Sequence, residues 1–441
     1  MDFQIQLRSA KNAQLQYAAR GWRLDSPKQL QPVESVSSQV QVAGWVLAEN
    51  EEHPVKLLLR QNGVVTVLAL NRNRPGVITK ILGETAEGHP RLCCGFDISV
   101  PLDGNGFEVG FEIDGIQQWA RVVEVRKAMK VLEGSGGHLF LSNDTNRSVD
   151  QYTGQYLISP AELERWDAYL ETLGMIRKTH QAEIVFLAAP SKEYVFPEHY
   201  PFAPGKMSPM MQLTRKFAEY NERLVYPVGE LKACREISYA RGDTHWTDYG
   251  GMIAAEAVLE ALGIDFDFFE AMPKFALRSV TGDLGNKITP VLRYPTYLAE
   301  FNAAGMSIGF NNGIDNHGRI WIFERENALG GTAVVFGDSF SKNMVPWLSL
   351  VFKRLLYVHA AASIDPTILA EERPDVVILQ TNSRFVVNAP HATLSTKNVI
   401  AKKVAALTPS DLDRLAAVVH AQPEEPYKGW MLELTEAASA K

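Results

Sequence analysis

Cysteine is scarce in this sequence of 441 residues. The three cysteines, Cys93, Cys94 and Cys234, are an odd number with one adjacent pair, which is poor material for a set of disulfides. They lack the Cys-x-x-Cys or Cys-His spacing of a zinc site, and the histidines are dispersed along the chain. We therefore expect reduced cysteines that fill a core or a strand, and no metal site.

Long apolar runs are also missing, and no stretch is long enough to span a bilayer. The N-terminus lacks the basic segment followed by an apolar one that forms a signal peptide. We expect a cytoplasmic protein without membrane insertion. A chain from which an export signal had been removed would look the same, and that chain would be periplasmic.

Positive charge is not in excess. The 44 Lys and Arg residues stand against 51 Asp and Glu residues, and the net charge of -7 includes no basic stripe. This balance argues against a nucleic-acid partner and against an anionic membrane surface. No glycine-rich phosphate loop follows a predicted strand, so we expect no nucleotide cofactor bound in that way.

The composition is otherwise that of an ordinary globular protein, with 46% hydrophobic and 22% charged residues. The length exceeds what a single hydrophobic core normally serves, so we predict two domains, residues 1–128 and 129–441. Short β-type runs separated by turns predict an antiparallel β-sandwich in the first domain; they are residues 39–47, 55–59, 64–70, 95–100 and 107–113. It carries no catalytic cluster, so a structural and a glycan-binding accessory role both remain open.

The second domain alternates buried strands with helices. Ser159, followed by Pro160 and Glu162, predicts a helix start, and the apolar spacing continues to a stop at Gly174. Short apolar runs at residues 183–189, 332–336, 356–361 and 375–379 predict a mainly parallel sheet with helices on both faces. Ligands of such sheets bind at the carboxyl ends of the strands. That rule selects the turns Pro190-Ser191-Lys192, Gly337-Asp338-Ser339 and Gln380-Thr381-Asn382.

Ser339 is the best candidate nucleophile in these turns. It directly follows a buried strand and Gly337, where a tight turn exposes the hydroxyl and lets backbone N–H groups face an oxyanion. Gly-Asp-Ser alone is common in turns, so the assignment depends on a base. Asp243 and His245 supply one, because a carboxylate two residues from a histidine can orient it, and they stand on a loop before a helix over residues 247–263.

These residues carry a resemblance to a known family. The sequence resembles the alginate O-acetyltransferases of the AlgX and AlgJ type, which are SGNH-hydrolase-like, over roughly residues 132–385. Further landmarks occur in the family's order: Gly136-Gly137-His138-Leu139-Phe140-Leu141 with Asn143-Asp144, Pro190-Ser191-Lys192 with Tyr194 and Pro197, Thr281-Gly282-Asp283-Leu284, and Arg373-Pro374-Asp375-Val376-Val377. The resemblance implies an SGNH-hydrolase-like α/β domain, with Ser339 as nucleophile, His245 as general base and Asp243 as its orienting carboxylate.

Three further residues are candidates for binding. Asn382 can donate to an oxyanion beside the Ser339 N–H, although a capping role fits equally well. Lys192 can contact a substrate hydroxyl or carboxylate, and the simpler interpretation is a solvated turn lysine. Arg384 occupies the place where the family often has an Arg after a Glu, but Ser383 stands where the Glu would be. Asp338 is expected to stabilise the turn rather than to act on His245.

The resemblance implies a serine O-acetyltransferase that acylates a hydroxyl of a carbohydrate or bacterial polysaccharide. An esterase with the same triad differs only in its acceptor, water, and the sequence does not separate the two. A non-catalytic glycan-binding protein is the alternative from another class. No cofactor is expected beyond an acyl donor, which is acetyl-CoA or another soluble carrier in a cytoplasmic protein; the family implies an acyl-donor protein instead.

Overall fold

The structure is a computed structural model that describes residues 3–10, 18–28, 31–33, 39–102, 106–127, 130–142, 144–288 and 290–439. The chain divides into two compact units, Met1–Met129 and Lys130–Lys441. Residues 128 and 129, between which the sequence analysis placed a domain boundary, lie outside the described residues.

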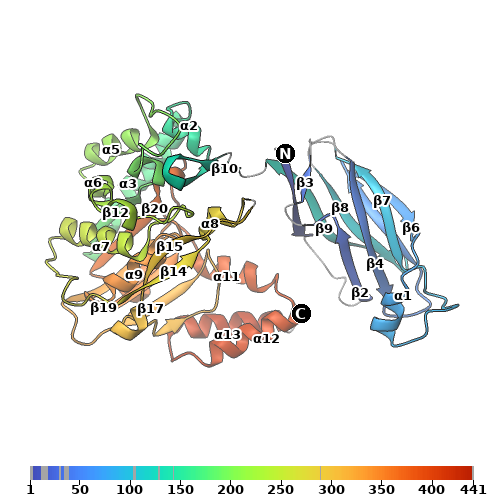
Figure 1. Cartoon of the computed structure of the whole chain (residues 1–441). Helices are drawn as coiled ribbons and strands as arrows, with labels where there is room; N and C mark the ends of the chain where they lie inside the picture. Colours follow the sequence, from blue (N-terminus) through green and yellow to red (C-terminus); the bar gives the residue numbers. More distant parts are fainter. Residues whose placement is uncertain are drawn as a thin grey trace. The chain divides into compact units, whose positions relative to one another are not determined.

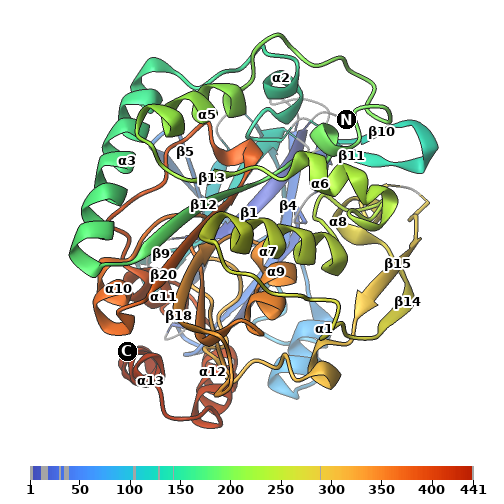
Figure 2. The same ribbon diagram turned by 90° about the vertical axis from the view of Figure 1, so that its left-hand side faces the viewer.

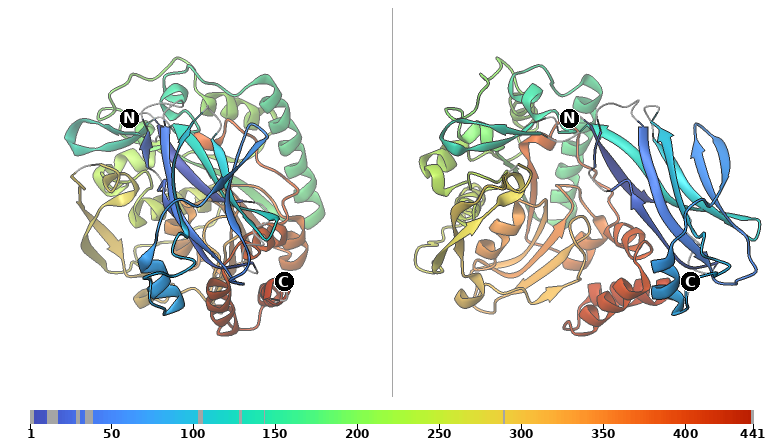
Figure 3. Two further views of the ribbon diagram at one scale, coloured as in Figure 1. Left: turned by 90° about the vertical axis from the view of Figure 1, so that its right-hand side faces the viewer. Right: turned by 45° about the vertical axis from the view of Figure 1, so that its right-hand side comes forward.

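The first unit contains two antiparallel sheets that enclose one hydrophobic core. Alternation explains the packing: Val40 and Val42 of β4 are buried, whereas Gln39 and Gln41, which alternate with them, are exposed. Figure 3 shows these blue and cyan strands from two sides. The six-stranded sheet has the order β3 (Pro32–Val33), β1 (Phe3–Ser9), β9 (Ile116–Lys127), β8 (Phe107–Ile113), β5 (Val55–Gln61), β6 (Val64–Ala69); the other is β2 (Ala19–Ser26), β4 (Gln39–Ala48), β7 (Gly95–Pro101), and α1 (Pro75–Val77) precedes β7.

The second unit is built on a seven-stranded sheet (Figure 1). Its first five strands are parallel, and β17 runs against β19 and β16. The mainly parallel α/β sheet that the sequence predicts is therefore present. The order is β13 (Leu224–Val225), β12 (Glu183–Ala189), β20 (Val376–Asn382), β18 (Gly330–Gly337), β19 (Phe352–His359), β17 (Ile320–Glu324), β16 (Phe310–Asn311).

Helices cover both faces of this sheet because the central strands are apolar on both sides. In β12, Phe186 enters one core cluster and Leu187 the other. Helices α7 and α9 cross over the strands in Figure 2. The first cluster includes residues of α3 (Pro160–His180), α5 (Pro209–Glu219), α10 (Pro366–Glu372), α11 (Thr396–Val404), α12 (Pro409–His420) and α13 (Pro426–Ser439); the second includes residues of α4 (Lys192–Val195), α6 (Val228–Ala233), α7 (Asp248–Leu262) and α9 (Ser341–Leu348).

Two small hairpins lie outside the main sheet. The first pairs β10 (Lys130–Glu133) with β11 (Leu139–Ser142), and α2 (Ser148–Tyr152) follows it. The second pairs β14 (Phe275–Val280) with β15 (Tyr294–Ala299), and α8 (Gly282–Gly285) lies in the connection between its strands. Within the described part of the chain, no helix has the length and apolar character needed to cross a membrane.

Two predicted boundaries are wrong. Gly174 does not end α3, which continues to His180 because Leu173 and Ile176 pack into the core on either side of it; burial there exceeds the cost of about 1 kcal/mol for a mid-helix glycine. The strand predicted at residues 356–361 begins earlier and ends earlier, at Phe352–His359. The helix predicted over residues 247–263 is confirmed, with Thr247 and Gly263 as its caps.

Arg354 on β19 connects the sheet to the end of α10 and to the residue just before α13. Its guanidinium binds the carboxylate of Glu372 at 2.7 and 3.0 Å and that of Glu425 at 2.9 and 3.1 Å. Arg354→Met would leave both carboxylates without this partner, so we expect the free energy of unfolding to fall by about 3 kcal/mol in urea denaturation. Arg414→Met, which removes an exposed i,i+3 pair with Asp411, should cost less than about 0.5 kcal/mol. Equal losses in the two variants would contradict this role.

Candidate active site

The turn that carries Ser339 is fixed by the buried carboxylate of Asp338. Its Oδ1 accepts from the Phe340 N–H and from Gln380 Nε2, both at 2.9 Å, and its Oδ2 accepts from the Asn382 N–H at 2.7 Å. Burial raises the pKa of Asp338, and these hydrogen bonds oppose the rise. The expected role of Asp338 in stabilising the turn is confirmed, and it ties the ends of β18 and β20 together.

Gly337 leaves room for this arrangement. A Cβ at that position would collide with the Ser341 hydroxyl and lie 2.9 Å from Gln380 Oε1, so only glycine fits. Gln380 Oε1 also accepts from the Asp338 N–H at 2.8 Å and from Ser341 Oγ at 2.6 Å. Ser339 itself is half-buried, two residues before the first residue of α9. The turn therefore holds its serine, which is only partly buried, at the carboxyl edge of the sheet.

The second segment of the site is the loop at residues 240–245, which we call the histidine loop. An antiparallel bridge between Tyr239 and Trp246 closes it, and α7 begins just beyond. Trp246 Nε1 donates to the Phe340 carbonyl at 2.8 Å, and the two rings pack edge to face with centroids 5.0 Å apart. The loop is thus anchored on the residue that follows Ser339.

The structure brings Ser339, His245 and Asp243 together in one hydrogen-bonded chain. His245 Nε2 lies 2.8 Å from Ser339 Oγ, and His245 Nδ1 lies 2.7 Å from Asp243 Oδ1. A carboxylate only accepts, so Nδ1 carries the proton and Nε2 is free to accept from the serine. About a quarter of each of the His245 and Asp243 side chains is exposed, at 26% and 25%.

Electrostatics favours a charged pair. Burial works against the charged form of His245, but the hydrogen bond and the negative charge of Asp243 outweigh it and raise the pKa of His245 above its ordinary value. Burial likewise works to raise the pKa of Asp243, and the hydrogen bonds and positive charge of His245 lower it. Asp243 therefore stays ionised and stabilises an imidazolium beside it.

Asp283 is a site residue whose role sequence reasoning missed, although it stands in a family landmark. Its carboxylate accepts from the Thr244 N–H at 2.7 Å and from Thr244 Oγ1 at 2.6 Å, and its own N–H donates to Asp243 Oδ2 at 3.1 Å. Gly282 makes the approach possible, with a φ of 64° and no room for a Cβ against Gly242. Burial and the charge of Asp243 raise the pKa of Asp283. The signal in the sequence was the Thr281-Gly282-Asp283 turn itself.

Asp243, His245 and Asp283 also form the group with metal-ligand geometry among the described residues, with donor atoms within 4.8 Å of one another. Their ligand atoms are already used in hydrogen bonds, Asp243 with His245 and Asp283 with Thr244. We therefore interpret the group as proton-handling.

Asn382 is the last residue of β20, and two hydrogen bonds fix the orientation of its side-chain amide. Its Oδ1 accepts from Ser191 Oγ at 2.9 Å and from the Arg384 N–H at 3.0 Å. Its Nδ2 is buried and has no partner among the described residues. Ser383, the departure from the family pattern, accepts from the Ser191 N–H at 2.9 Å. It thus connects the two turns at the ends of β12 and β20.

Lys192 corrects the sequence analysis, which made it a solvated lysine or a substrate contact. It is only 2% exposed, and Nζ donates to the carbonyls of Leu139, Ala240, Arg241 and Asp243 at 2.7–3.2 Å. Burial lowers the pKa of Lys192 to about 7, while Asp243 and Asp283 favour its charged form. Lys192 therefore anchors the histidine loop through its backbone carbonyls, and its buried ammonium group is not available to a substrate.

Arg384 is half-buried, and its guanidinium lies over the Phe385 ring, 5.1 Å from the centroid. Its charge acts to lower the pKa values of His245 and Glu193, so it lies within electrostatic range of both. Asn143, part of a family landmark, lies outside the described residues.

The chain is similar to several solved structures. It is 13% identical to Bacillus cereus PatB1, with a TM-score of 0.46, over 59% of this chain and 97% of that one. The O-acetyltransferase domain of Pseudomonas putida AlgJ is 16% identical, with a TM-score of 0.38, over 70% and 100%. Pseudomonas aeruginosa AlgX is 14% identical, with a TM-score of 0.34, over 59% and 63%. AlgJ and AlgX, whose motifs the sequence resembles, are thus both among the matching structures.

No family model and no curated protein matches the chain.

Removing the Asp283 carboxylate should loosen the histidine loop. Thr244 is 4% exposed, so Asp283→Ala leaves its buried N–H and hydroxyl without acceptors, and we expect unfolding to become easier by about 2 kcal/mol. Thermal and urea unfolding measure the change. Asp267→Ala, which removes an exposed carboxylate that accepts from the Phe269 N–H, is the matched control and should cost about 0.5 kcal/mol. A loss for Asp283→Ala no larger than the control's would contradict this role.

Proposed function

We propose that this protein is a serine-dependent O-acetyltransferase that moves an acetyl group through an acyl-Ser339 intermediate onto a hydroxyl of a carbohydrate or polysaccharide. One observation carries the chemistry: the chain from Asp243 Oδ1 through His245 to Ser339 Oγ, with links of 2.7 and 2.8 Å, at the carboxyl edge of the sheet. The carbohydrate acceptor is the part that the motif resemblance suggests.

In the first half-reaction, Ser339 Oγ attacks the acyl carbonyl carbon of the donor while its proton passes to His245 Nε2. The tetrahedral intermediate collapses, the bond to the leaving group of the donor breaks, and His245 returns the proton to that group. Asp243 remains ionised throughout and stabilises the imidazolium, in keeping with its lowered pKa. The enzyme then carries the acyl group as an ester on Ser339.

Two donors are available for the oxyanion. The Ser339 N–H has no acceptor among the described residues, although the N–H groups of Asp338 and Phe340 on either side of it are engaged. The second is Asn382 Nδ2, which is buried and unpaired while its Oδ1 is held by two donors. We assign both groups to the developing negative charge.

In the second half-reaction, His245 takes the proton of an acceptor hydroxyl, whose oxygen attacks the acyl carbon and releases Ser339 Oγ, which recovers the proton. A water molecule in place of the sugar hydroxyl makes the protein an esterase, the second candidate that the same geometry permits. We propose that no cofactor is needed beyond the donor, either acetyl-CoA, another acyl carrier or a donor protein. The β-sandwich unit contributes none of these residues, and we propose an accessory role for it.

Ser339→Ala should lower the release of p-nitrophenol from p-nitrophenyl acetate by about 1,000-fold, because no other group supplies the nucleophile. His245→Ala should lose nearly as much. Ser349→Ala, which removes a buried serine after α9 that donates to the Pro346 carbonyl, is the control and should keep the rate. Mass spectrometry of a stopped wild-type reaction should find the acetyl group on Ser339. A Ser339→Ala protein as active as the wild type would exclude an enzyme at this site.

The pH dependence should show the influence of Asp243. His245 must be neutral to accept the serine proton, and Asp243 raises its pKa, so the wild-type rate falls as the pH drops through that raised value. Asp243→Asn removes the negative charge, so the acidic limb of kcat/KM should move to lower pH while the plateau falls by about 1,000-fold. Asp267→Asn, at an exposed carboxylate, should leave both unchanged. An acidic limb that stays in place or moves to higher pH would argue against this pair.

A further inference from the structure

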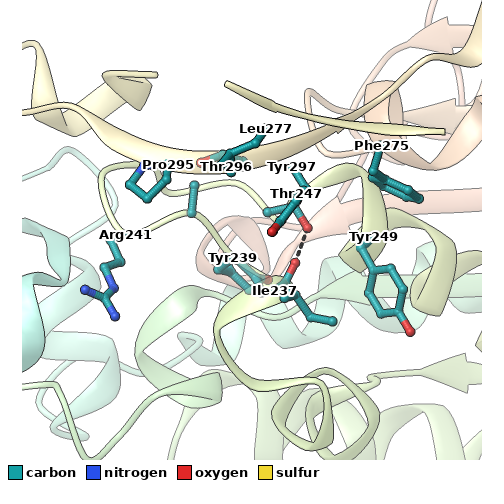
Figure 4. Close-up of a pocket in the computed structure, with 11 residues that line it drawn as sticks. Ile237, Tyr239, Arg241, Thr247, Tyr249, Phe275, Leu277, Pro295, Thr296 and Tyr297 are labelled. Atoms are coloured by element: carbon teal, nitrogen blue, oxygen red, sulfur yellow. Dashed lines mark hydrogen bonds between the residues drawn. The ribbon is translucent and has the colours of Figure 1, made fainter. Parts of the chain in front are cut away.

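A cavity of about 480 Å³ lies beside the histidine loop and is lined by none of Ser339, His245 or Asp243. Figure 4 shows its two walls. Side chains of the β14–β15 hairpin form one wall, namely Phe275, Leu277, Pro295, Thr296 and Tyr297. The other wall comes from the histidine loop, the residues just before it and the start of α7, and it includes Ile237, Tyr239, Arg241, Thr247 and Tyr249.

The same hairpin is hydrogen-bonded to the histidine loop. The N–H groups of Leu284 and Gly285, which lie between β14 and β15, donate to the Gly242 carbonyl at 3.0 and 3.1 Å. At the end of β15, the Ala299 N–H donates to the carboxylate of Asp248, the first residue of α7, over 2.8 Å. The cavity therefore lies between two segments that are connected directly to the residues carrying His245 and Asp243.

The walls present apolar surface to solvent. Leu277 is 55% exposed, Tyr297 53% and Ile237 44%, and all three line the cavity. Large apolar side chains gathered and left exposed in this way mark a binding surface more often than scattered ones do. The rings of Tyr249 and Phe275 pack against each other, with centroids 6.3 Å apart, and together add aromatic surface to the lining of the cavity.

Polar groups also line the cavity. Thr296 is 6% exposed, and its Oγ1 is buried without a hydrogen-bond partner among the described residues. Thr247 Oγ1, the Tyr249 ring and Arg241 belong to the opposite wall, where Thr247 donates to the Ile237 carbonyl. A purely hydrocarbon ligand would leave the Thr296 hydroxyl unpaired, at a cost that a ligand with hydroxyl groups avoids.

We propose that this cavity is a subsite for sugar rings of the acceptor, bound apart from the reacting hydroxyl. A pyranose ring combines an apolar C–H face, which packs on aromatic rings, with hydroxyl groups at its rim that can bond Thr296 and the polar groups opposite. Cavities of this size and mixed lining bind small organic ligands in proteins generally.

The subsite would also serve catalysis. Sugar bound here holds its neighbouring hydroxyl next to His245, so that binding energy gained away from the reacting atoms helps the hydroxyl to compete with water for the acyl-Ser339 ester. This inference rests on the proposed function, because partition between transfer and hydrolysis has meaning only for an acyl-enzyme.

The test measures that partition. Wild type and variants are given p-nitrophenyl acetate with one of three hexasaccharides, a neutral glucan, a chitin oligomer or a polyuronate, and the ratio of acetylated sugar to free acetate is measured. Because both products come from the same acyl-enzyme, the ratio does not depend on the rate of acylation. Tyr297→Ala should lower it about tenfold, the effect of one lost ring contact. Leu298→Ala, the adjacent residue on β15, is 38% exposed and does not line the cavity, so its ratio should equal that of the wild type.

Calorimetric binding of the same hexasaccharides to Ser339→Ala protein separates the subsite from the chemistry. The subsite is supported if Tyr297→Ala weakens sugar binding and Leu298→Ala does not. This result would stand even if the wild-type protein transferred no acetyl group and the proposed function failed. If none of the three sugars binds, or if Tyr297→Ala binds and partitions like the wild type, the subsite is excluded.

Discussion

The buried carboxylate of Asp338 is the interaction on which the site depends. Its oxygens accept hydrogen bonds from three different groups and so join the end of β18 to the end of β20, two parallel strands whose carboxyl ends meet at one edge. Through these bonds the turn that carries Ser339 is joined to the backbone of Asn382. Without a carboxylate there, the Phe340 and Asn382 N–H groups would be buried without an acceptor. Gly-Asp-Ser is common in turns, and in this protein the hydrogen bonds to Asp338 fix the conformation of that turn.

Environment assigns different states to carboxylates that lie close together. Asp243 has a lowered pKa because a hydrogen-bonded imidazole faces it, whereas Asp283 and Asp338 have raised pKa values because burial dominates. The negative charge is thereby favoured on the carboxylate that faces His245 Nδ1. The negative charges of Asp243 and Asp283 favour the charged form of Lys192, whose ammonium group donates to four backbone carbonyls.

Much of this arrangement could be predicted from the sequence. Alternating apolar residues located five strands of the β-sandwich, and apolar runs located β12, β18, β19 and β20, because strand burial leaves a direct trace in the order of residues. The N-terminal strands β1, β2 and β3 and the strand β9 were missed; in β2, partly buried residues replace strict alternation. Gly174 gave a wrong prediction of the end of α3, because the packing of this helix into the core outweighs the low helix propensity of glycine.

Within the site, the sequence identified the side chains and not their partners. Ser339, His245 and Asp243 could be named because each residue type suits one chemical role, and Asp243 and His245 are neighbours in sequence. The position of Lys192 below the loop and the bonds of Asp283 to Thr244 follow from contacts across 39 to 53 residues. No local pattern encodes such contacts, so a buried lysine was taken for a solvated one.

The separate pairing of β14 with β15 has a further consequence. Among the described strands, β14 and β15 pair only with each other, while the serine turn follows β18 and Asn382 lies in β20 of the main sheet. Changes in length or side chains at the outer part of the hairpin therefore leave the ladder of the main sheet intact. Under the proposed function, evolution or protein engineering can alter what this hairpin contacts while Ser339, His245 and Asp243 stay in place, so new acceptor preferences become accessible without rebuilding the chemistry.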